Sequence, residues 1–157
     1  MNYGTKFEAT LANSWVASSL NLVRMKITET GEEKPCDERV DTDNFRIFNE
    51  LKSTGNESFK IREIKKHQMK ALFQWDLKFK DSASIVSIEF RKTSTAYIVS
   101  FTSLIKYVHT ENLSEITPKN IEENILHYKL KFKNDIYVIN ADFLKFLEKC
   151  KEAKAWK

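Results

Sequence analysis

Apolar residues in this chain recur with two different periods, and the period changes several times along the sequence. Where they recur every three to four residues, as from Phe7 through Leu11 to Trp15, the pattern predicts an amphipathic helix. Where they alternate with polar residues, the pattern predicts a half-exposed strand. The predicted helices cover about residues 5–20, 61–79, 103–108 and 141–153, with one more beginning at Thr117-Pro118. The predicted strands cover about residues 22–28, 36–40, 45–52, 83–90, 95–100, 127–132 and 135–139.

These helices and strands follow one another without an internal repeat, a linker or a low-complexity segment. The length of 157 residues suits one hydrophobic core. We therefore expect a single domain over residues 1–157, of the mixed α/β class. The turns between its elements are expected at about residues 30–35, 41–44, 53–58, 91–94 and 133–134.

Composition narrows the class of protein without identifying a function. Hydrophobic residues at 41% argue against disorder, and a net charge of +4 tolerates a polyanionic partner without demanding one. Cys36 and Cys150 have no companion Cys or His pattern, so we expect two reduced thiols, with a disulfide as the alternative. No apolar run reaches the length of a membrane span, and the N-terminus lacks a signal-type apolar segment. We expect a soluble, cytoplasmic protein that does not act at a membrane.

The pattern Glu-x-Lys occurs four times, but only one copy falls in a predicted strand. The copies are Glu32/Lys34, Glu50/Lys52, Glu63/Lys65 and Glu152/Lys154. Positions i and i+2 point in different directions on a helix, whereas on a strand they share a face. Glu50 and Lys52 therefore share a face of the strand 45–52, together with Arg46 and Phe48. A surface ladder of salt bridges is the alternative interpretation of this pair.

Asp37 lies on the strand before Glu50, and pairing of the two strands would bring the two carboxylates together. Two carboxylates near a lysine suit a hard cation such as Mg²⁺, which prefers oxygen ligands. Such a cation polarises a phosphate and lowers the pKa of an attacking water. Lys52 would orient that water or stabilise charge on the phosphate. The pattern predicts a nuclease site at Asp37, Glu50 and Lys52.

Two further polar residues lie on or beside apolar helical stripes. Gln68 falls in the middle of the stripe of the predicted helix 61–79. A buried amide needs hydrogen-bond partners, so Gln68 either caps a backbone group or faces a polar site inside the fold. Glu8 borders the stripe of the first helix, where it either reaches solvent or turns toward the metal site as a further carboxylate.

Several short motifs occur together in a recognisable order. They are Gly4-Thr5-Lys6-Phe7-Glu8, Pro35-Cys36-Asp37, Phe48-Asn49-Glu50-Leu51-Lys52-Ser53-Thr54, Phe59 and His67-Gln68-Met69-Lys70-Ala71-Leu72. In this order they resemble the RecU-type Holliday junction resolvases and their phage-borne relatives, within the PD-(D/E)XK nuclease superfamily. The resemblance covers the first half of the chain well and the second half more loosely, through residues 96–108 and 135–146.

The resemblance implies a restriction-endonuclease-like fold, which is a mixed β-sheet flanked by helices. It also implies a homodimer that uses Mg²⁺ or Mn²⁺ to nick two opposed strands of a four-way DNA junction. Such an enzyme would serve DNA recombination and repair in a bacterial or phage-infected cell. Carried over by motif, the metal-site acids would be Glu8, Asp37 and Glu50, the catalytic lysine Lys52, the site-supporting residue Gln68, and weaker candidates Thr54 and His67.

Basic residues gather around the second predicted helix and in one later loop. We expect a DNA-contacting surface there, with a solvated helix face as the alternative. The residues expected to contact DNA are Lys60, Lys65, Lys66, Lys70, Arg91 and Lys92. Two other functions stay open: a nuclease of the same fold that cuts flap, single-stranded or specific duplex DNA, and a non-catalytic nucleic-acid-binding protein.

Overall fold

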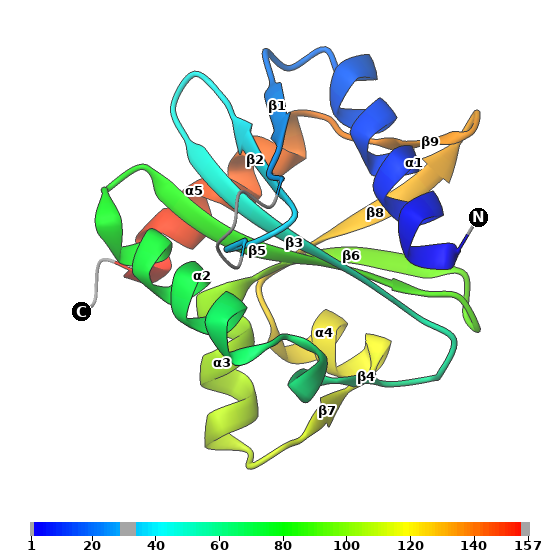
Figure 1. Cartoon of the computed structure of the whole chain (residues 1–157), viewed down its shortest axis with the longest axis vertical. Helices are drawn as coiled ribbons and strands as arrows, with labels where there is room; N and C mark the ends of the chain where they lie inside the picture. The colour runs from blue at the N-terminus through cyan, green and yellow to red at the C-terminus, as the bar shows by residue number, and fades with distance from the viewer. Residues whose placement is uncertain (1, 29–33, 155–157) are drawn as a thin grey trace.

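The computed structural model describes residues 2–28 and 34–154 of the chain. They form a large mixed β-sheet with helices on both faces (Figure 1), which confirms the mixed α/β class predicted from the sequence. The main sheet has the strand order β1-β2-β3-β5-β6-β8-β9. Its strands are β1 (Val23–Lys26), β2 (Glu38–Asp41), β3 (Arg46–Thr54), β5 (Ser82–Phe90), β6 (Thr95–Ser100), β8 (His127–Lys133) and β9 (Ile136–Val138). The helices are α1 (Tyr3–Ala17), α2 (Lys66–Lys78), α3 (Phe101–Thr110), α4 (Pro118–Asn124) and α5 (Ala141–Lys154).

The strands that matter for the site lie side by side in the sheet. β2 runs antiparallel to β3, with Glu38 paired to Asn49. β3 runs parallel to β5, with Glu50 paired to Val86, and α2 lies on the connection between them. β5 is buried along nearly its whole length because helices cover both of its faces. A separate two-stranded sheet pairs β4 (Phe59–Lys60) with β7 (Glu115–Ile116).

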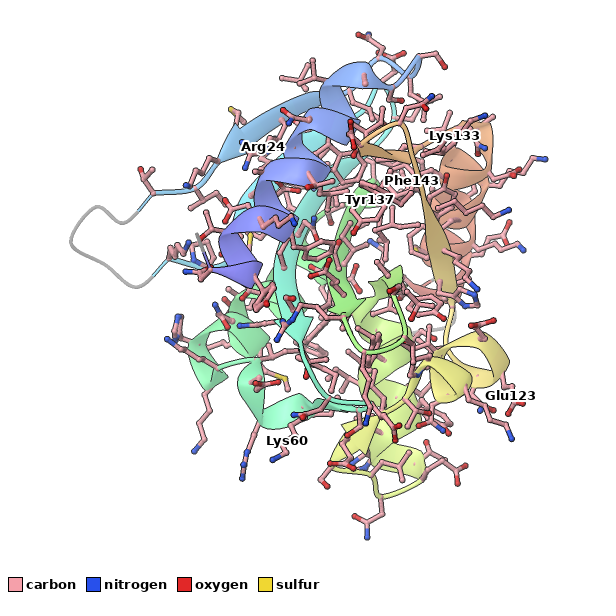
Figure 2. The ribbon with its side chains drawn as sticks, turned by 90° about the vertical axis from the view of Figure 1, so that its right-hand side faces the viewer. Arg24, Lys60, Glu123, Lys133, Tyr137 and Phe143 are labelled. Atoms are coloured by element: carbon pink, nitrogen blue, oxygen red, sulfur yellow. The ribbon has the colours of Figure 1, made fainter. Side chains whose placement is uncertain are left out.

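The helices cover the sheet as two layers, with α1 and α5 on one face and α2, α3 and α4 on the other (Figure 1). Tyr137 and Phe143 belong to the core of the first layer, between α1 and α5 (Figure 2). Successive residues of β3 alternate between the two layers. Ile47 packs toward α1 and α5, whereas the ring of Phe48 stacks on Trp75 of α2 at 3.9 Å between centroids. Even-numbered residues of β3 therefore face α2.

The second helix begins later than the apolar pattern predicts. Residues Ile61–Glu63 form a short 3₁₀ turn, η1, and α2 begins only at Lys66. Ile64 lies between the two with extended backbone angles and a buried side chain. Ile64 is therefore apolar because it packs into the core, although it is not part of a helix. The spacing of apolar residues alone does not distinguish such a residue from a member of a helical stripe.

Two other helices differ from the prediction at both ends, since α1 begins at Tyr3 and α3 ends at Thr110, each two residues outside its predicted bound. α1 ends at Ala17 instead of near residue 20, since Ser18 is extended and its hydroxyl donates to the carbonyl of Ile139 at 3.2 Å. α3 begins at Phe101, two residues earlier than predicted, because the Ser100 side chain accepts an N–H of the first turn. The Ser100 side chain thus acts as the N-cap that sets the start of α3.

Other differences lie in turns, in strand ends and in the short strands β4 and β7, which the pattern does not predict. The hairpin between β8 and β9 turns at Asn134 and Asp135, which both have positive φ, one residue later than predicted. The second strand begins at Glu38 instead of Cys36. The turn predicted at residues 30–35 falls mostly on 29–33, outside the described residues. No helix within the described ranges has the length and apolar character that crossing a bilayer requires.

Candidate active site

Asp37 and Glu50 lie side by side at the point where β2 begins. Because Glu38 pairs with Asn49, the residues that follow in the antiparallel register are Asp37 and Glu50. The Asp37 carboxylate also accepts the backbone N–H of Leu51 at 2.8 Å, which holds this side chain against β3. Both carboxylates are on the α2 side of the sheet. The fold therefore places Asp37 next to Glu50, as the pairing of the two strands predicts.

Glu50 is almost completely buried, at 1% exposure, and has one paired and one free oxygen. Its Oε2 lies 2.9 Å from the Nζ of Lys52, two residues along the same face of β3. Its Oε1 has no hydrogen-bond partner among the described residues. Burial and the charge of Asp37 raise the pKa of Glu50 to about 7, while Lys52 opposes the shift. The site thus contains a buried carboxylate oxygen that accepts no hydrogen bond from the described residues.

Lys34 contributes a second ammonium group to this corner of the fold. Its Nζ lies 3.1 Å from an oxygen of Asp37. Burial lowers the pKa of Lys34, but the hydrogen bond to Asp37 and the charges of nearby carboxylates raise it above its ordinary value. These carboxylates are Asp37, Glu50 and Glu8. No sequence pattern singles out Lys34, because it falls in a predicted turn and not on a predicted strand.

The residues present fit a divalent cation of the Mg²⁺ type. Mg²⁺ is held in proteins by one or two carboxylates together with waters and substrate phosphates. Asp37 and Glu50 supply two carboxylates, and the orphaned Oε1 of Glu50 is the kind of buried oxygen that such an ion satisfies. Burial and the charge of Glu50 raise the pKa of the adjacent Cys36 thiol, so this sulfur stays protonated and favours no soft metal. Within residues 2–28 and 34–154, no cluster of three or more Asp, Glu, His or Cys side chains could hold a metal.

Glu8 does not join the acid pair in this structure. Its carboxylate lies on the α1 side of the sheet, 3.5 Å from Arg24 and 3.7 Å from Lys26, both on β1. Figure 2 shows Arg24 on β1 beside α1. Glu8 is also close enough to Lys34 to raise the pKa of that ammonium together with Asp37 and Glu50. The metal-ligand role of Glu8 therefore stays a prediction.

Sequence reasoning missed Glu38, which is the most deeply buried acid near the site. It is fully buried and accepts hydrogen bonds at 2.8 Å from Trp15, Asn49 and Arg24. The available signal was the alternation of β2, which puts Glu38 on the same core-facing side as Val40. A buried acid at such a position needs hydrogen-bond donors, and the side chains of Trp15 and Asn49 supply them here.

Gln68 is buried on α2, and its side-chain oxygen caps the helix. Oε1 accepts the N–H of Lys65 at 3.0 Å, which is the first of the two roles considered for this amide. The Thr54 hydroxyl accepts the N–H of Asn56 at 3.2 Å and so orders the loop after β3. These two hydrogen bonds go to backbone groups and not to Asp37 or Glu50.

The six basic residues predicted to contact DNA separate into two groups. Those on or before α2 have exposed side chains on the helix layer that covers the Glu50 face, and they are Lys60, Lys65, Lys66 and Lys70. Figure 2 shows Lys60 at the molecular surface. The two loop residues are engaged within the fold. Arg91 donates to Ser53 at 2.7 Å and lies over the Tyr3 ring, and Lys92 lies 3.3 Å from Glu57.

Comparison with known proteins identifies a family and similar solved structures. Residues 43–149 match the RecU family, described as Recombination protein U. Among solved structures, Hjc of Archaeoglobus fulgidus, a Holliday junction resolvase from an archaeal hyperthermophile, is similar with a TM-score of 0.49 and 16% sequence identity. That match covers 64% of this chain and 78% of Hjc. No curated protein sequence matches the chain.

Proposed function

The chain belongs to the RecU family of recombination proteins, and we propose that it is a divalent-metal-dependent endonuclease that resolves four-way DNA junctions. The observation that carries the proposal is the buried Glu50 carboxylate, with one oxygen bound by Lys52 and the other free beside Asp37. A buried, half-satisfied carboxylate is costly to the fold, and such groups concentrate at functional sites. The membership of the chain in a family of recombination proteins favours DNA as the substrate.

Each residue of the site has a separate part in the proposed reaction. Asp37 and Glu50 would hold Mg²⁺ or Mn²⁺, which when bound supplies Lewis-acid activation of a phosphate and of water. The Lys52 ammonium, fixed by Glu50 at 2.9 Å, would stabilise the charge that develops on the phosphate oxygens. Gln68 would support the site indirectly by fixing the first turn of α2.

The proposal extends to the assembly and its location. Resolving a junction requires one nick in each of two opposed strands, and two identical sites related by a two-fold axis suit that task. We therefore propose a homodimer, working in recombination and repair in the cytoplasm of a bacterial or phage-infected cell. Sedimentation of the protein with and without a four-way junction would test the dimer.

Junction cleavage tests the proposed function directly. With Mg²⁺, the protein is expected to introduce paired nicks in a synthetic four-way junction labelled on each strand in turn, and EDTA is expected to stop the reaction. The matched control is Asp37→Asn, which removes one metal-site charge while keeping the size of the side chain. It should bind the junction at the same salt concentration without nicking it. Unchanged nicking by this variant would contradict the assigned site.

Substrate competition separates the remaining alternatives. A linear duplex, a flap and a single strand of the same sequence are offered against the junction at moderate salt, because non-specific phosphate binding weakens steeply as salt rises. Equal cleavage of linear DNA would favour a nuclease of another specificity. Absence of both cleavage and divalent-ion binding would favour a non-catalytic DNA-binding protein.

The exposed lysines of α2 are expected to contribute phosphate contacts. Lys66 and Lys70 are one helical turn apart, so replacing both by Gln removes two neighbouring charges without touching the core. Junction binding should weaken, and the slope of log affinity against log salt should fall by about 2, roughly 0.9 for each lost phosphate contact. The control replaces Lys145 and Lys149 of α5, which have the same spacing on the opposite helix layer. An equal change in slope for both pairs would contradict an α2 contact surface.

A further inference from the structure

The side chain of Glu38 ties together four elements next to the candidate active site. One oxygen accepts the indole N–H of Trp15 on α1 and the amide N–H of Asn49 on β3, each at 2.8 Å. The other oxygen accepts from Arg24 on β1, also at 2.8 Å. Asn49 in turn accepts the hydroxyl of Ser87 on β5 at 2.8 Å. One carboxylate on β2 therefore links α1, β1 and β3, and reaches β5 through Asn49.

A network of this kind is more than the fold needs for stability. Moving a carboxylate from water into the core is costly, and an apolar side chain of similar volume often stabilises the same position as well. The benefit of a buried polar network is that its donors and acceptors match in only one arrangement. A shift of β1, β2 or β3 along its neighbour would break hydrogen bonds that Glu38 accepts.

The arrangement fixed by Glu38 is the one that creates the acid pair. Glu38 and Asn49 are register partners, and they directly precede or follow Asp37 and Glu50 in sequence. A slip of one residue would move Asp37 to the level of a residue whose side chain faces α1 and not α2. The hairpin turn sets the register at the far end of β2, where the Thr42 N–H donates to the Phe45 carbonyl at 2.9 Å. Glu38 holds it at the opposite end, where Asp37 and Glu50 lie.

We propose that Glu38 is a positioning residue, which holds Asp37 beside Glu50 through its hydrogen bonds to Arg24, Trp15 and Asn49. It lies on the α1 side of the sheet and does not touch the metal position or the substrate. The catalytic significance of this role rests on the proposed function, since it is the nuclease reaction that requires the acid pair.

Arg24→Met is the sharpest variant, because positioning and simple electrostatics predict opposite results. Arg24 is a cation near the site and also pairs with Glu8. Its removal should strengthen divalent-ion binding if only charge matters. If Glu38 positions the acid pair, the loss of one of its donors should weaken that binding instead. Trp15→Phe is the second variant, since it removes another donor to Glu38 without changing any charge.

The control for general loss of stability is Asp76→Asn. Asp76 is a buried acid on α2 that accepts the N–H of Ser84 at 3.1 Å and a hydroxyl from Thr102, away from β1 and β2. This substitution perturbs a second buried polar network in the opposite layer while leaving the donors of Glu38 in place. It should destabilise the protein without changing the geometry of the acid pair.

Two measurements test the proposal. The first is amide hydrogen exchange in the metal-free protein, with Leu51 compared to Ile98 at the centre of the sheet, because the Leu51 N–H binds Asp37 directly. The second is the dissociation constant for Mn²⁺, measured by calorimetry on each folded variant. We expect Arg24→Met and Trp15→Phe to speed Leu51 exchange relative to Ile98 by about tenfold and to weaken Mn²⁺ binding by a similar factor.

The possible outcomes distinguish this inference from the proposed function. In Asp76→Asn, the ratio of Leu51 to Ile98 exchange and the affinity for Mn²⁺ should match the wild type. An unchanged exchange ratio in Arg24→Met and Trp15→Phe would overturn the positioning role, as would equal or tighter Mn²⁺ binding by Arg24→Met. If the wild type binds no Mn²⁺ and cuts no DNA, the proposed function fails, and the exchange ratio alone still decides whether Glu38 holds Asp37 in place.

Discussion

Glu50→Gln is expected to lower the rate of junction cleavage by about 10³-fold, corresponding to roughly 4 kcal/mol of transition-state stabilisation. The amide keeps the size of the side chain but cannot supply a negative oxygen to a divalent ion. It also replaces the anionic partner of the Lys52 ammonium, which lies at 2.9 Å, by a neutral amide that holds this charge more weakly. Junction binding, for which we propose the exposed lysines of α2, should be retained. Single-turnover cleavage and gel-shift binding on the same preparation measure the two quantities separately.

The same substitution has an opposite effect on the stability of the metal-free protein. The folded-state pKa of Glu50 is about 7, above its ordinary value, so the folded protein binds this proton more tightly than the unfolded chain does. The resulting stability is fully present below the ordinary pKa near 4.5 and is lost as the pH rises through about 7. The loss is at most roughly 3 kcal/mol in the wild type. Glu50→Gln cannot titrate, so it should remove this pH dependence and be more stable than the wild type at pH 8.

Urea unfolding in EDTA at several pH values between 5 and 8 measures this difference. Glu57→Gln is the matched control, because it removes an acid whose side chain is 72% exposed and should keep the wild-type pH dependence. Addition of Mg²⁺ should stabilise the wild type more at pH 8 than at pH 5, since the ion and the proton compete for Glu50. An equal pH slope in Glu50→Gln and the wild type would show that another group is responsible.

The acid pair could be predicted from sequence because strand alternation and antiparallel pairing are local rules. Glu50 and Lys52 had to share a face once residues 45–52 formed a strand, and they do. Asp37 required one further assumption, that β2 and β3 pair without a slip. The structure meets this assumption with Glu38 opposite Asn49. The cap of α4 at Thr117 was equally local, and its side chain accepts the first-turn N–H as predicted.

The surroundings of the site could not be predicted, because they depend on which layers meet. Glu8 borders the apolar stripe of α1 whether it faces solvent or the metal site. Only the packing of α1 beside β1 gives it Arg24 and Lys26 as partners. Glu38 occupies a core-facing position that alternation alone would assign to an apolar residue. Its donors come from residues 15, 24 and 49, which are distant in sequence. Long-range donors of this kind leave no periodic signal.

Lys154→Met is expected to reduce the free energy of unfolding by about 3 kcal/mol, because it leaves a buried acid without its cation. Lys154 on α5 is 10% exposed at its side chain, and its Nζ lies 3.8 Å from the carboxylate of Asp76. The ammonium also donates to the carbonyl of Asp76 at 2.7 Å and to that of Ser82. It therefore joins α5 to the last turn of α2 and the start of β5. Cations are favoured at such helix C-termini.

A double-mutant cycle identifies the buried pair as the cause. The double variant Asp76→Asn/Lys154→Met should lose less free energy of unfolding than the two single variants lose together, by about 1 kcal/mol or more. The reason is that the charge neutralised by Lys154 is then absent. Lys151→Met is the control, because Lys151 lies on the same helix with an exposed side chain and should change stability by less than about 0.5 kcal/mol. Equilibrium urea unfolding measures all five proteins, the four of the cycle and the control. Equal, small losses for the two lysine variants would mean that α5 is held by its apolar face alone, through residues such as Phe146 and Leu147.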